Sequence, residues 1–209
     1  MSDGQVISVG EVSRSERVVM FDVDGGLADL SELAHLLTGD PEGSRRQAWQ
    51  RFFEHVGQAA VIEPGRDVVE AVAGLGFVVV YSTTRPVSCA GQTRMWLGEH
   101  GFPPGRALLC RSRGDHRAAV DVKVGHCRAV GSWLSAFVDD ESEAVEVLRS
   151  GGVRANCFAA LSGLRVRELR ATLTAGTPGA PTGPGHRSRG HGHRSAPPRR
   201  RGAVAQGAD

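Results

Sequence analysis

Short apolar runs alternate with longer stretches in which apolar residues recur at helical spacing from residue 17 to residue 171. Each short run is bounded by turn residues and has the length of a buried strand. The predicted strands cover residues 17–22, 76–82, 106–110, 135–139 and 153–158. The predicted helices cover residues 31–37, 44–56, 66–73, 88–100, 122–134, 141–150 and 164–171. This alternation is typical of a Rossmann-like α/β domain, with a five-stranded, mainly parallel sheet and helices on both faces.

Serine and glycine residues mark several of the predicted helix ends. Ser31, Ser44 and Ser88 stand at helix starts, where a serine hydroxyl can accept a hydrogen bond from a free backbone N–H group. Gly76 and Gly101 follow helices and favour the positive φ that is common at helix ends. These signals predict one folded domain over residues 16–171.

The composition changes after this domain. Residues 172–209 are rich in Gly, Pro, Ala and Arg and offer little to bury, so we predict a disordered basic tail there and a flexible N-terminus over residues 1–15. From residue 171 onward, six arginines and one aspartate give a net charge of +5, which leaves −3 for the rest of a chain of net charge +2. The tail can contact nucleic acid or another polyanion; a solvated tail without a partner is the alternative.

Membrane proteins and disulfide-rich proteins are classes that this chain does not resemble. No apolar run approaches the ~20 residues of a membrane span, and the N-terminus lacks a charged head followed by an apolar stretch. The four cysteines show neither a Cys-x-x-Cys pair nor a His/Cys ligand spacing. We therefore expect a cytoplasmic protein without a membrane partner, whose oligomeric state does not follow from the sequence.

Acidic residues follow two of the predicted strands, at the edge where a parallel sheet forms its binding crevice. Asp22 ends the first strand, Asp24 comes two residues later, and Asp139 and Asp140 end the fourth strand. A carboxylate at the end of a buried strand is costly unless it is paired or bound to a cation, and oxygen ligands suit Mg²⁺. The four aspartates therefore predict a magnesium site. A calcium loop does not fit, because Leu33 stands at its twelfth position in place of glutamate.

Thr83, Arg85 and Lys123 complete the predicted site. Thr83 and Arg85 follow the second strand, and Lys123, the single lysine among 25 basic residues, stands at the start of the helix before the fourth strand. An aspartate can attack phosphorus and form an aspartyl-phosphate when cations neutralise the phosphoryl oxygens. Lys123 can supply one positive charge, while Thr83 and Arg85 can hold the phosphoryl group. Asp24 can protonate the leaving alkoxide and later deprotonate water.

Each of these features has an ordinary structural explanation when it is taken alone. Acids and glycines are common in turns, a single arginine is more often a surface residue than a phosphate ligand, and Asp139 with Asp140 can cap the following helix. The catalytic hypothesis depends on their occurrence together and in order, each at the end of a predicted strand and with the only lysine nearby.

Four segments resemble the motifs of the haloacid dehalogenase superfamily of phosphohydrolases. FDVDGG resembles its Asp-x-Asp-Gly-Thr/Val motif, VVVYSTTRP its second motif, DVK its lysine motif and FVDDESEAVEVLRSGGV its acidic motif. Within the superfamily, the chain is most similar to the phosphatase domain of polynucleotide kinase-phosphatases and its stand-alone bacterial and phage relatives. That likeness is carried by WQRFF, TTRP, WLGEHG and the loop CRSRGDHRAAVDVK, and it covers about residues 17–160.

The resemblance implies a role for each matching residue. Asp22 is the expected nucleophile and Asp24 the expected general acid/base. Thr83 and Arg85 are expected to bind the phosphoryl group, and Lys123 to neutralise it. The expected metal ligands are Asp22, Asp24, Asp139 and Asp140, and the residues expected to line the substrate side are Arg113, Asp115 and Arg117.

The chain departs from the family pattern at three places. Gly26 replaces the usual Thr or Val, and Thr84 replaces the usual Gly. Ala118 and Ala119 stand where an acid often follows the second arginine of the loop, with Asp121 as its nearest substitute. These departures predict altered stiffness around the nucleophile and reduced activity.

The resulting prediction is a Mg²⁺-dependent phosphatase that acts on a polynucleotide 3′-phosphate or a nucleotide. The segments after the first and second motifs hold about 40 and fewer than about 25 residues, so a large cap domain is not expected and the site should be open. No Gly-x-x-x-x-Gly-Lys-Ser/Thr loop occurs, so no kinase domain is expected. The alternatives are a small-molecule nucleotidase or sugar phosphatase, and a degenerate relative that binds phosphate or nucleic acid without turnover.

Overall fold

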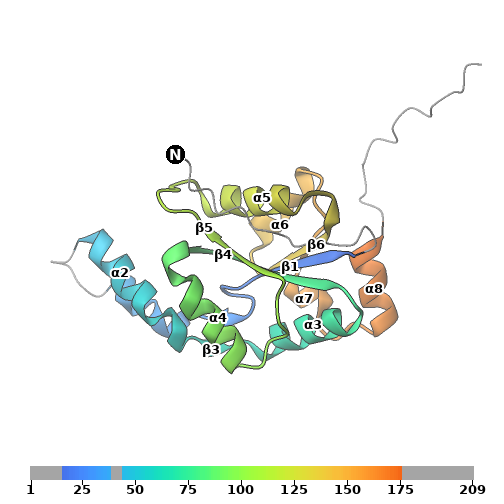
Figure 1. Ribbon diagram of the computed structural model, residues 1–209, viewed down its shortest axis with the longest axis horizontal. Coiled ribbons are helices and arrows are strands. Elements are labelled where there is room, and N and C mark those ends of the chain that lie inside the picture. The colour runs from blue at the N-terminus through green and yellow to red at the C-terminus, as the bar shows by residue number, and fades with distance from the viewer. Residues whose placement is uncertain (1–15, 39–43, 176–209) are drawn as a thin grey trace, which may run out of the picture.

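The computed structural model describes residues 16–38 and 44–175. At its centre is a five-stranded sheet of order β5-β4-β1-β6-β7, in which all neighbouring strands are parallel (Figure 1). Its strands are β1 (Val18–Asp22), β4 (Val78–Pro86), β5 (Ala107–Arg111), β6 (Leu134–Asp139) and β7 (Ala155–Cys157). A separate antiparallel pair joins β2 (Ala28–Asp29) to β3 (Ala60–Val61). Strand β1 is therefore the middle strand, and it ends at the centre of one sheet edge.

Helices cover both faces of this sheet. The α-helices of the described residues are α1 (His35–Thr38), α2 (Arg45–His55), α3 (Glu63–Gly74), α4 (Ala90–Glu99), α5 (Ala119–Val130), α6 (Ser142–Ser150), α7 (Phe158–Leu161) and α8 (Val166–Thr174). Short 3₁₀ helices are η1 (Ser31–Leu33), η2 (Val56–Gln58), η3 (Val87–Cys89) and η4 (Gly131–Trp133). Helices α5 and α6 pack on one face, and α3, α4, α7 and α8 pack on the other (Figure 1).

The apolar run of β1 supplies both cores. Successive side chains of a strand point to opposite faces, so a strand covered on both sides is apolar throughout. Val19 and Phe21 join the core that contains α3, α4, α7 and α8, whereas Val18 and Met20 join the core that contains α5 and α6. This double burial explains why the sequence shows an unbroken apolar run directly before Asp22.

The predicted five-stranded parallel sheet with helices on both faces is confirmed. Strand β4 runs four residues beyond its predicted end, to Pro86. The sequence did not predict β2, β3 or α7, because elements of two to four residues are too short to show a periodic pattern. The helix predicted over residues 31–37 is divided into η1 and α1.

One of the three predicted serine caps is present. The Ser44 hydroxyl accepts a hydrogen bond from the Gln47 N–H at the start of α2, and the Gln47 side chain accepts one from the Ser44 N–H. The caps predicted at Ser31 and Ser88 are wrong. Each of these serines lies inside a 3₁₀ turn rather than before a helix.

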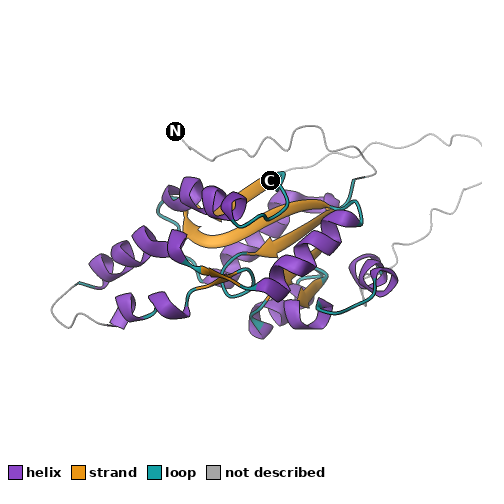
Figure 2. Ribbon diagram, turned by 90° about the horizontal axis from the view of Figure 1, so that it is seen from below, coloured by secondary structure: helices purple, strands orange, loops and turns teal. Residues whose placement is uncertain are grey.

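The segment between β2 and β3 forms a helical arm, consisting of η1, α1, α2 and η2. The β2–β3 pair connects it to the sheet, and its own small core contains Leu33, Phe52 and Val56. The arm extends away from the carboxyl edge of the sheet (Figures 1 and 2). Its described part is a helical extension rather than a large cap domain, as the length of this segment predicts.

The last helix of the domain extends past the predicted domain boundary at residue 171. Helix α8 continues to Thr174 and buries Leu173, whose carbonyl accepts hydrogen bonds from Ser135 and Arg154 at 2.9 Å each. The predicted tail therefore begins inside α8. The rest of that tail, residues 176–209, and the predicted flexible residues 1–15 lie outside the described part. No helix within the described ranges has the length and hydrophobicity to cross a bilayer.

Candidate active site

Asp22 is the last residue of β1, at the centre of the carboxyl edge of the sheet. It lies beside Ser82 of β4 in the strand register, and the N–H of Val23 donates a hydrogen bond to the Ser82 carbonyl at 3.0 Å. The chain then turns at Gly25, whose φ is +78°. Asp22 is only 3% exposed, so the fold buries a carboxylate at the edge where parallel sheets bind ligands.

Four of the predicted site residues meet at this edge. Carboxylate oxygens of Asp22, Asp139 and Asp140 lie within 4.8 Å of one another. Lys123 Nζ lies 3.0 and 2.9 Å from the two carboxylate oxygens of Asp139 and 3.4 Å from Asp22 Oδ2. Lys123 is buried one turn inside α5, because that helix begins at Ala119 rather than at the predicted residue 122.

The charges of this cluster do not balance among the described side chains. Burial raises the pKa of Asp22 well above its usual value; attraction to Lys123 opposes that shift, and repulsion by Asp139 adds to it. Burial alone would lower the pKa of Lys123, but attraction to Asp22 and Asp139 outweighs it, so the pKa is raised. Burial also raises the pKa of Asp140. Glu141 Oε2 also lies 3.8 Å from Lys123 Nζ, so one ammonium faces four carboxyl groups, and a further cation would stabilise their ionised forms.

The side chains present fit a divalent cation. Asp22 Oδ1 is buried and has no hydrogen-bond partner among the described residues, which is costly for a carboxylate unless a cation binds it. Asp139 and Asp140 add further carboxylate oxygens, and an oxygen-only donor set is the kind that Mg²⁺ prefers. The structure therefore brings together three of the four predicted metal ligands.

The carboxylate of Asp24 does not join the three clustered aspartates but pairs with side chains of β4. Its Oδ2 accepts a hydrogen bond from the Thr83 hydroxyl at 2.8 Å, and its Oδ1 faces Arg85 Nε at 2.9 Å and Nη2 at 2.7 Å. Arg85 is 2% exposed and also donates from Nη1 to the Thr93 hydroxyl at 3.2 Å. Thr83 and Arg85, the two predicted phosphoryl ligands, thus hold the predicted general acid/base in place. No sequence pattern predicts a role for Thr93, which lies on α4 eight residues after Arg85.

Arg111, for which no sequence motif predicts a role, holds the loop between β5 and α5 in place. Arg111 donates hydrogen bonds to the carbonyls of Thr84 at 3.1 Å, Asp115 at 3.2 Å and Arg117 at 2.7 Å. Arg117 donates to both carboxylate oxygens of Asp115, at 3.0 and 2.7 Å, and these hydrogen bonds hold the pKa of Asp115 well below its usual range. Arg113 is exposed. Arg111 therefore ties the predicted substrate loop to the end of β4.

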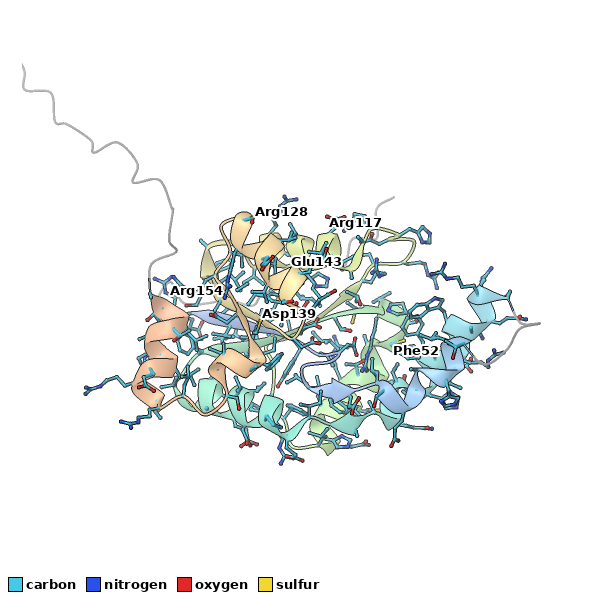
Figure 3. All side chains as sticks on the ribbon, turned by 180° about the vertical axis from the view of Figure 1, so that it is seen from behind. Phe52, Arg117, Arg128, Asp139, Glu143 and Arg154 are labelled. Carbon is cyan, nitrogen blue, oxygen red and sulfur yellow. The ribbon has the colours of Figure 1, made fainter. Side chains whose placement is uncertain are left out.

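A cleft of about 820 Å³ opens beside Asp24. Asp24 and Arg85 line it at the sheet edge, Arg111 and Arg117 line it on the β5–α5 loop, and Arg45 and Trp49 of α2 line it on the arm. Figure 3 labels Asp139 at the sheet, Arg117 on the β5–α5 loop and Phe52 on the arm. Among the predicted substrate residues, Asp115 and Arg117 line this cleft.

The same architecture occurs in solved structures. A chain of the Pnkp1/Rnl/Hen1 complex matches with a TM-score of 0.54 and 19% identity, over 72% of this chain and 48% of that chain. A chain of the Pnkp1/Rnl/Hen1 RNA repair complex matches with a TM-score of 0.52 and 19% identity, over 71% of this chain and 44% of that chain. The two likenesses show that the protein shares its α/β fold with these chains. CbbY from Rhodobacter sphaeroides, in complex with phosphate, matches with a TM-score of 0.48 and 14% identity, over 68% of this chain and 85% of that chain.

The likeness to the Pnkp1 complexes concerns only part of those chains. The protein spans about half the length of the two chains that it matches, with 48% and 44% covered. No protein-family model and no curated protein sequence matches the protein. The likeness therefore establishes the α/β fold alone, and the chemistry must be argued from the residues of the site.

The departures at Gly26 and Thr84 each have a structural explanation. A Cβ atom at Gly26 would lie 2.1 Å from Cε2 of Phe158, so the Phe158 ring occupies the space where a Thr or Val side chain would stand. A Cβ atom at Gly65 would lie 2.0 Å from the Gly26 carbonyl oxygen, so α3 also packs closely on this turn. Thr84 lies in the extended chain of β4, where no glycine is required.

Replacing Gly26 by threonine should therefore destabilise the protein through the Phe158 ring. We expect G26T to lower the free energy of unfolding by about 2–3 kcal/mol and F158A by about 3–5 kcal/mol, through overpacking and a cavity respectively. The double variant should lose at least about 2 kcal/mol less than the sum of the two losses. Urea unfolding of the four proteins measures this coupling; additive losses would show that Phe158 does not stand in for the missing side chain.

A half-buried histidine, His126, packs beside the site. His126 follows Lys123 by three residues on α5, and its Nδ1 lies 2.9 Å from the Ser82 hydroxyl. Its Nε2 lies 3.3 Å from the Cys110 carbonyl, and burial lowers the pKa of the imidazole. His126 thus links α5 to β4 and β5. The spacing of three residues from Lys123 was the available signal, since it places both side chains on one helix face.

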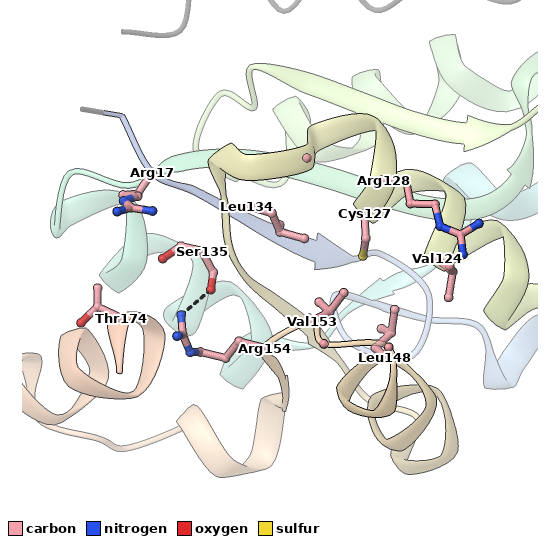
Figure 4. Close-up of a pocket in the computed structure, with 13 residues that line it drawn as sticks. Arg17, Val124, Cys127, Arg128, Leu134, Ser135, Leu148, Val153, Arg154 and Thr174 are labelled. Atoms are coloured by element: carbon pink, nitrogen blue, oxygen red, sulfur yellow. Dashed lines mark hydrogen bonds between the residues drawn. The ribbon is translucent and has the colours of Figure 1, made fainter. Parts of the chain in front are cut away.

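A second cavity, of about 510 Å³, lies at the opposite edge of the sheet (Figure 4). Arg17, Arg128 and Arg154 line it, and α5, α6 and α8 end beside it. Arg154 Nη1 donates hydrogen bonds to the Ser135 carbonyl at 2.7 Å and to the last turn of α8 at Leu173. Cations are stabilising at helix C-termini, so these arginines have a structural role there.

Proposed function

We propose that the protein is a metal-dependent phosphomonoesterase that forms an aspartyl-phosphate on Asp22. The observation that carries this proposal is the environment of Asp22: a buried carboxylate with one unpartnered oxygen, 3.4 Å from Lys123 and grouped with Asp139 and Asp140. A carboxylate is a competent nucleophile for phosphorus where nearby cations neutralise the phosphoryl oxygens. Buried carboxylate oxygens in structural ion pairs are mostly hydrogen-bonded, so the unpartnered Asp22 Oδ1 favours a binding role.

The proposed reaction has two steps. An oxygen of Asp22 attacks phosphorus, the bond from phosphorus to the leaving oxygen breaks, and Asp24 gives its proton to the leaving alkoxide. Water then attacks phosphorus, Asp24 takes a proton from that water, and inorganic phosphate leaves with the Asp22 carboxylate restored. Hydrogen bonds from Thr83 and Arg85 fix the position of the Asp24 carboxylate for both steps.

We propose Mg²⁺ as the metal and Asp22, Asp139 and Asp140 as the side chains that hold it. When bound, it supplies positive charge that lowers the cost of bringing an anionic phosphoryl group to a carboxylate. Lys123 supplies a second positive charge from the protein. Its hydrogen bond to Asp139 keeps the ammonium next to Asp22 rather than free in solvent.

The proposed substrate is a polynucleotide 3′-phosphate or a nucleotide. Four arginines and two aspartates line the cleft, so its charge favours an anion with more than one phosphate. The RNA repair complex whose chain resembles this one is consistent with a nucleic-acid substrate. We further propose that the basic tail strengthens nucleic-acid binding, although residues 176–209 lie outside the described part.

Phosphate release from a substrate panel tests this function. The panel contains a 3′-phosphorylated oligonucleotide, a 5′-mononucleotide, a sugar phosphate and an aryl phosphate, each with Mg²⁺ or with EDTA. We expect EDTA to lower turnover at least about 100-fold, and the 3′-phosphorylated oligonucleotide to be the best substrate by about tenfold in kcat/KM. Preference for the mononucleotide or sugar phosphate would select the small-molecule alternative. No turnover of any member by the folded protein would refute the proposal.

A further inference from the structure

We propose that Trp49 on the arm is the platform on which the terminal base of a 3′-phosphorylated polynucleotide stacks. This inference rests on the proposed phosphatase function, and it assigns the recognition of the leaving group to a residue outside the sheet. Trp49 and Asp24 line the same cleft. A substrate whose phosphate lies at the sheet edge would therefore extend its nucleoside toward α2.

Trp49 has the geometry of a fixed stacking surface. It is 39% exposed, although most large aromatic side chains of a folded domain are buried. Its ring stacks on Phe53 with centroids 5.5 Å apart and planes at 28°, and it meets Phe52 edge-on at 5.5 Å and 79°. Two neighbouring rings thus set the orientation of the indole, so little conformational entropy is lost when a base stacks on it.

The charge around Trp49 favours a nucleotide over an apolar ligand. Arg45 lines the cleft on the same helix, one turn before Trp49, and Arg111 and Arg117 line it on the β5–α5 loop. An aromatic surface between arginines is the combination that binds single-stranded nucleic acid, with rings for the bases and guanidinium groups for the phosphates. A phosphotyrosine peptide offers a ring but only one phosphate, whereas an oligonucleotide offers further phosphates to the arginines that line the cleft.

The cleft is large enough for this ligand. Its volume of about 820 Å³ lies within the ~300–1,000 Å³ typical of small-molecule sites. The arm carries Trp49 on a capped helix whose own core, Leu33, Phe52 and Val56, is separate from the cores of the sheet. Substitution of the exposed Trp49 should therefore change the cleft without unfolding the domain.

The kinetic test compares two substrates that differ only in the base. One is an oligonucleotide with a 3′-phosphorylated terminal nucleotide, and the other ends in a 3′-phosphorylated abasic residue. We expect W49A to lower kcat/KM about 5- to 100-fold on the first substrate and less than twofold on the second, because a stacked base contributes on this scale. W49F should retain most of the activity on the base-bearing substrate. M95A, which removes an exposed side chain of α4, should leave both values unchanged.

A binding experiment on a variant expected to be inactive tests base stacking without measuring turnover. In Asp22→Asn, titration with the base-bearing oligonucleotide should quench tryptophan fluorescence, and the additional W49F change should remove most of that quenching. W133F is the matched control, since Trp133 packs against the core beside α5 and α6. An active enzyme in which W49A affects both substrates equally, or neither, would overturn the inference and leave the proposed phosphatase intact.

If the enzyme turns over no substrate, the same titration still tests whether a base stacks on Trp49. Quenching that depends on Trp49 would then support base stacking while the phosphatase proposal fails. Quenching that W49F does not alter would overturn base stacking as well. Preference for a phosphotyrosine peptide, with a W49A effect on that peptide, would overturn the assignment to nucleic acid.

Discussion

Asp22→Asn should lower phosphate release at least about 10⁴-fold, the largest effect that we expect from any single substitution in this chain. Removal of a covalent nucleophile typically costs this much or more, because the rest of the site cannot replace the attacking atom. The asparagine side chain has nearly the same shape, so the strand end and the Lys123–Asp139 pair should remain. The measurement is single-turnover phosphate release with Mg²⁺ on the best substrate of the panel.

The folded state of this variant should be at least as stable as that of the wild type. The pKa of Asp22 is raised by burial, so the folded protein disfavours its charge, and a neutral amide avoids that cost. We expect an unfolding free energy that is unchanged or up to about 2 kcal/mol higher. Asp67→Asn, at an exposed position on α3, is the matched control for activity. Residual turnover above about 1% of wild type would show that Asp22 is not the nucleophile.

Lys123→Met should lower the free energy of unfolding by about 3–5 kcal/mol at neutral pH. The methionine keeps most of the buried volume but removes the ammonium that lies between Asp139 and Asp22. Like charges then face one another in a buried site without a compensating cation. Urea unfolding in the presence of EDTA measures this loss, and Arg94→Met, at an exposed position on α4, should change stability by less than about 0.5 kcal/mol.

The loss in Lys123→Met should depend on pH and on metal. The folded-state pKa of Asp22 lies above its unfolded value, so the folded state binds the proton more tightly and stability falls as pH rises between the two values. Without the ammonium this effect should grow, and the deficit relative to wild type should shrink as pH falls toward about 4. Added Mg²⁺ should restore part of the stability. A deficit that neither acid nor Mg²⁺ reduces would contradict this electrostatic explanation.

Much of the fold follows from the sequence because the short apolar runs of the strands and the helical spacing of apolar residues between them are both clear. Apolar runs such as that of β1 must be buried on both faces, which indicates a parallel sheet with helices on either side. The ends of parallel strands meet at one edge, so the grouping of Asp22, Asp139 and Asp140 could be expected from their positions at strand ends. Lys123 joins them because α5 leads directly into β6.

The remaining contacts depend on side-chain directions that a strand pattern does not specify. Asp24 and Arg85 were both placed at the sheet edge, but their pairing with each other depends on the turn at Gly25 and on the extension of β4 to Pro86. The filling of the Gly26 position by Phe158 is a contact between residues 132 positions apart. Neither residue type nor local spacing predicts such a long-range fit.

The arm has its own small core and joins the sheet through two strands of two residues each. The bond-breaking groups and the surface proposed to hold the leaving group are thus encoded in different stretches of the chain. Sequence changes within the arm can alter which molecules enter the cleft without disturbing Asp22, Lys123 or the acids around them. Such a division allows a lineage of these proteins to diversify its substrates while the reaction itself is preserved.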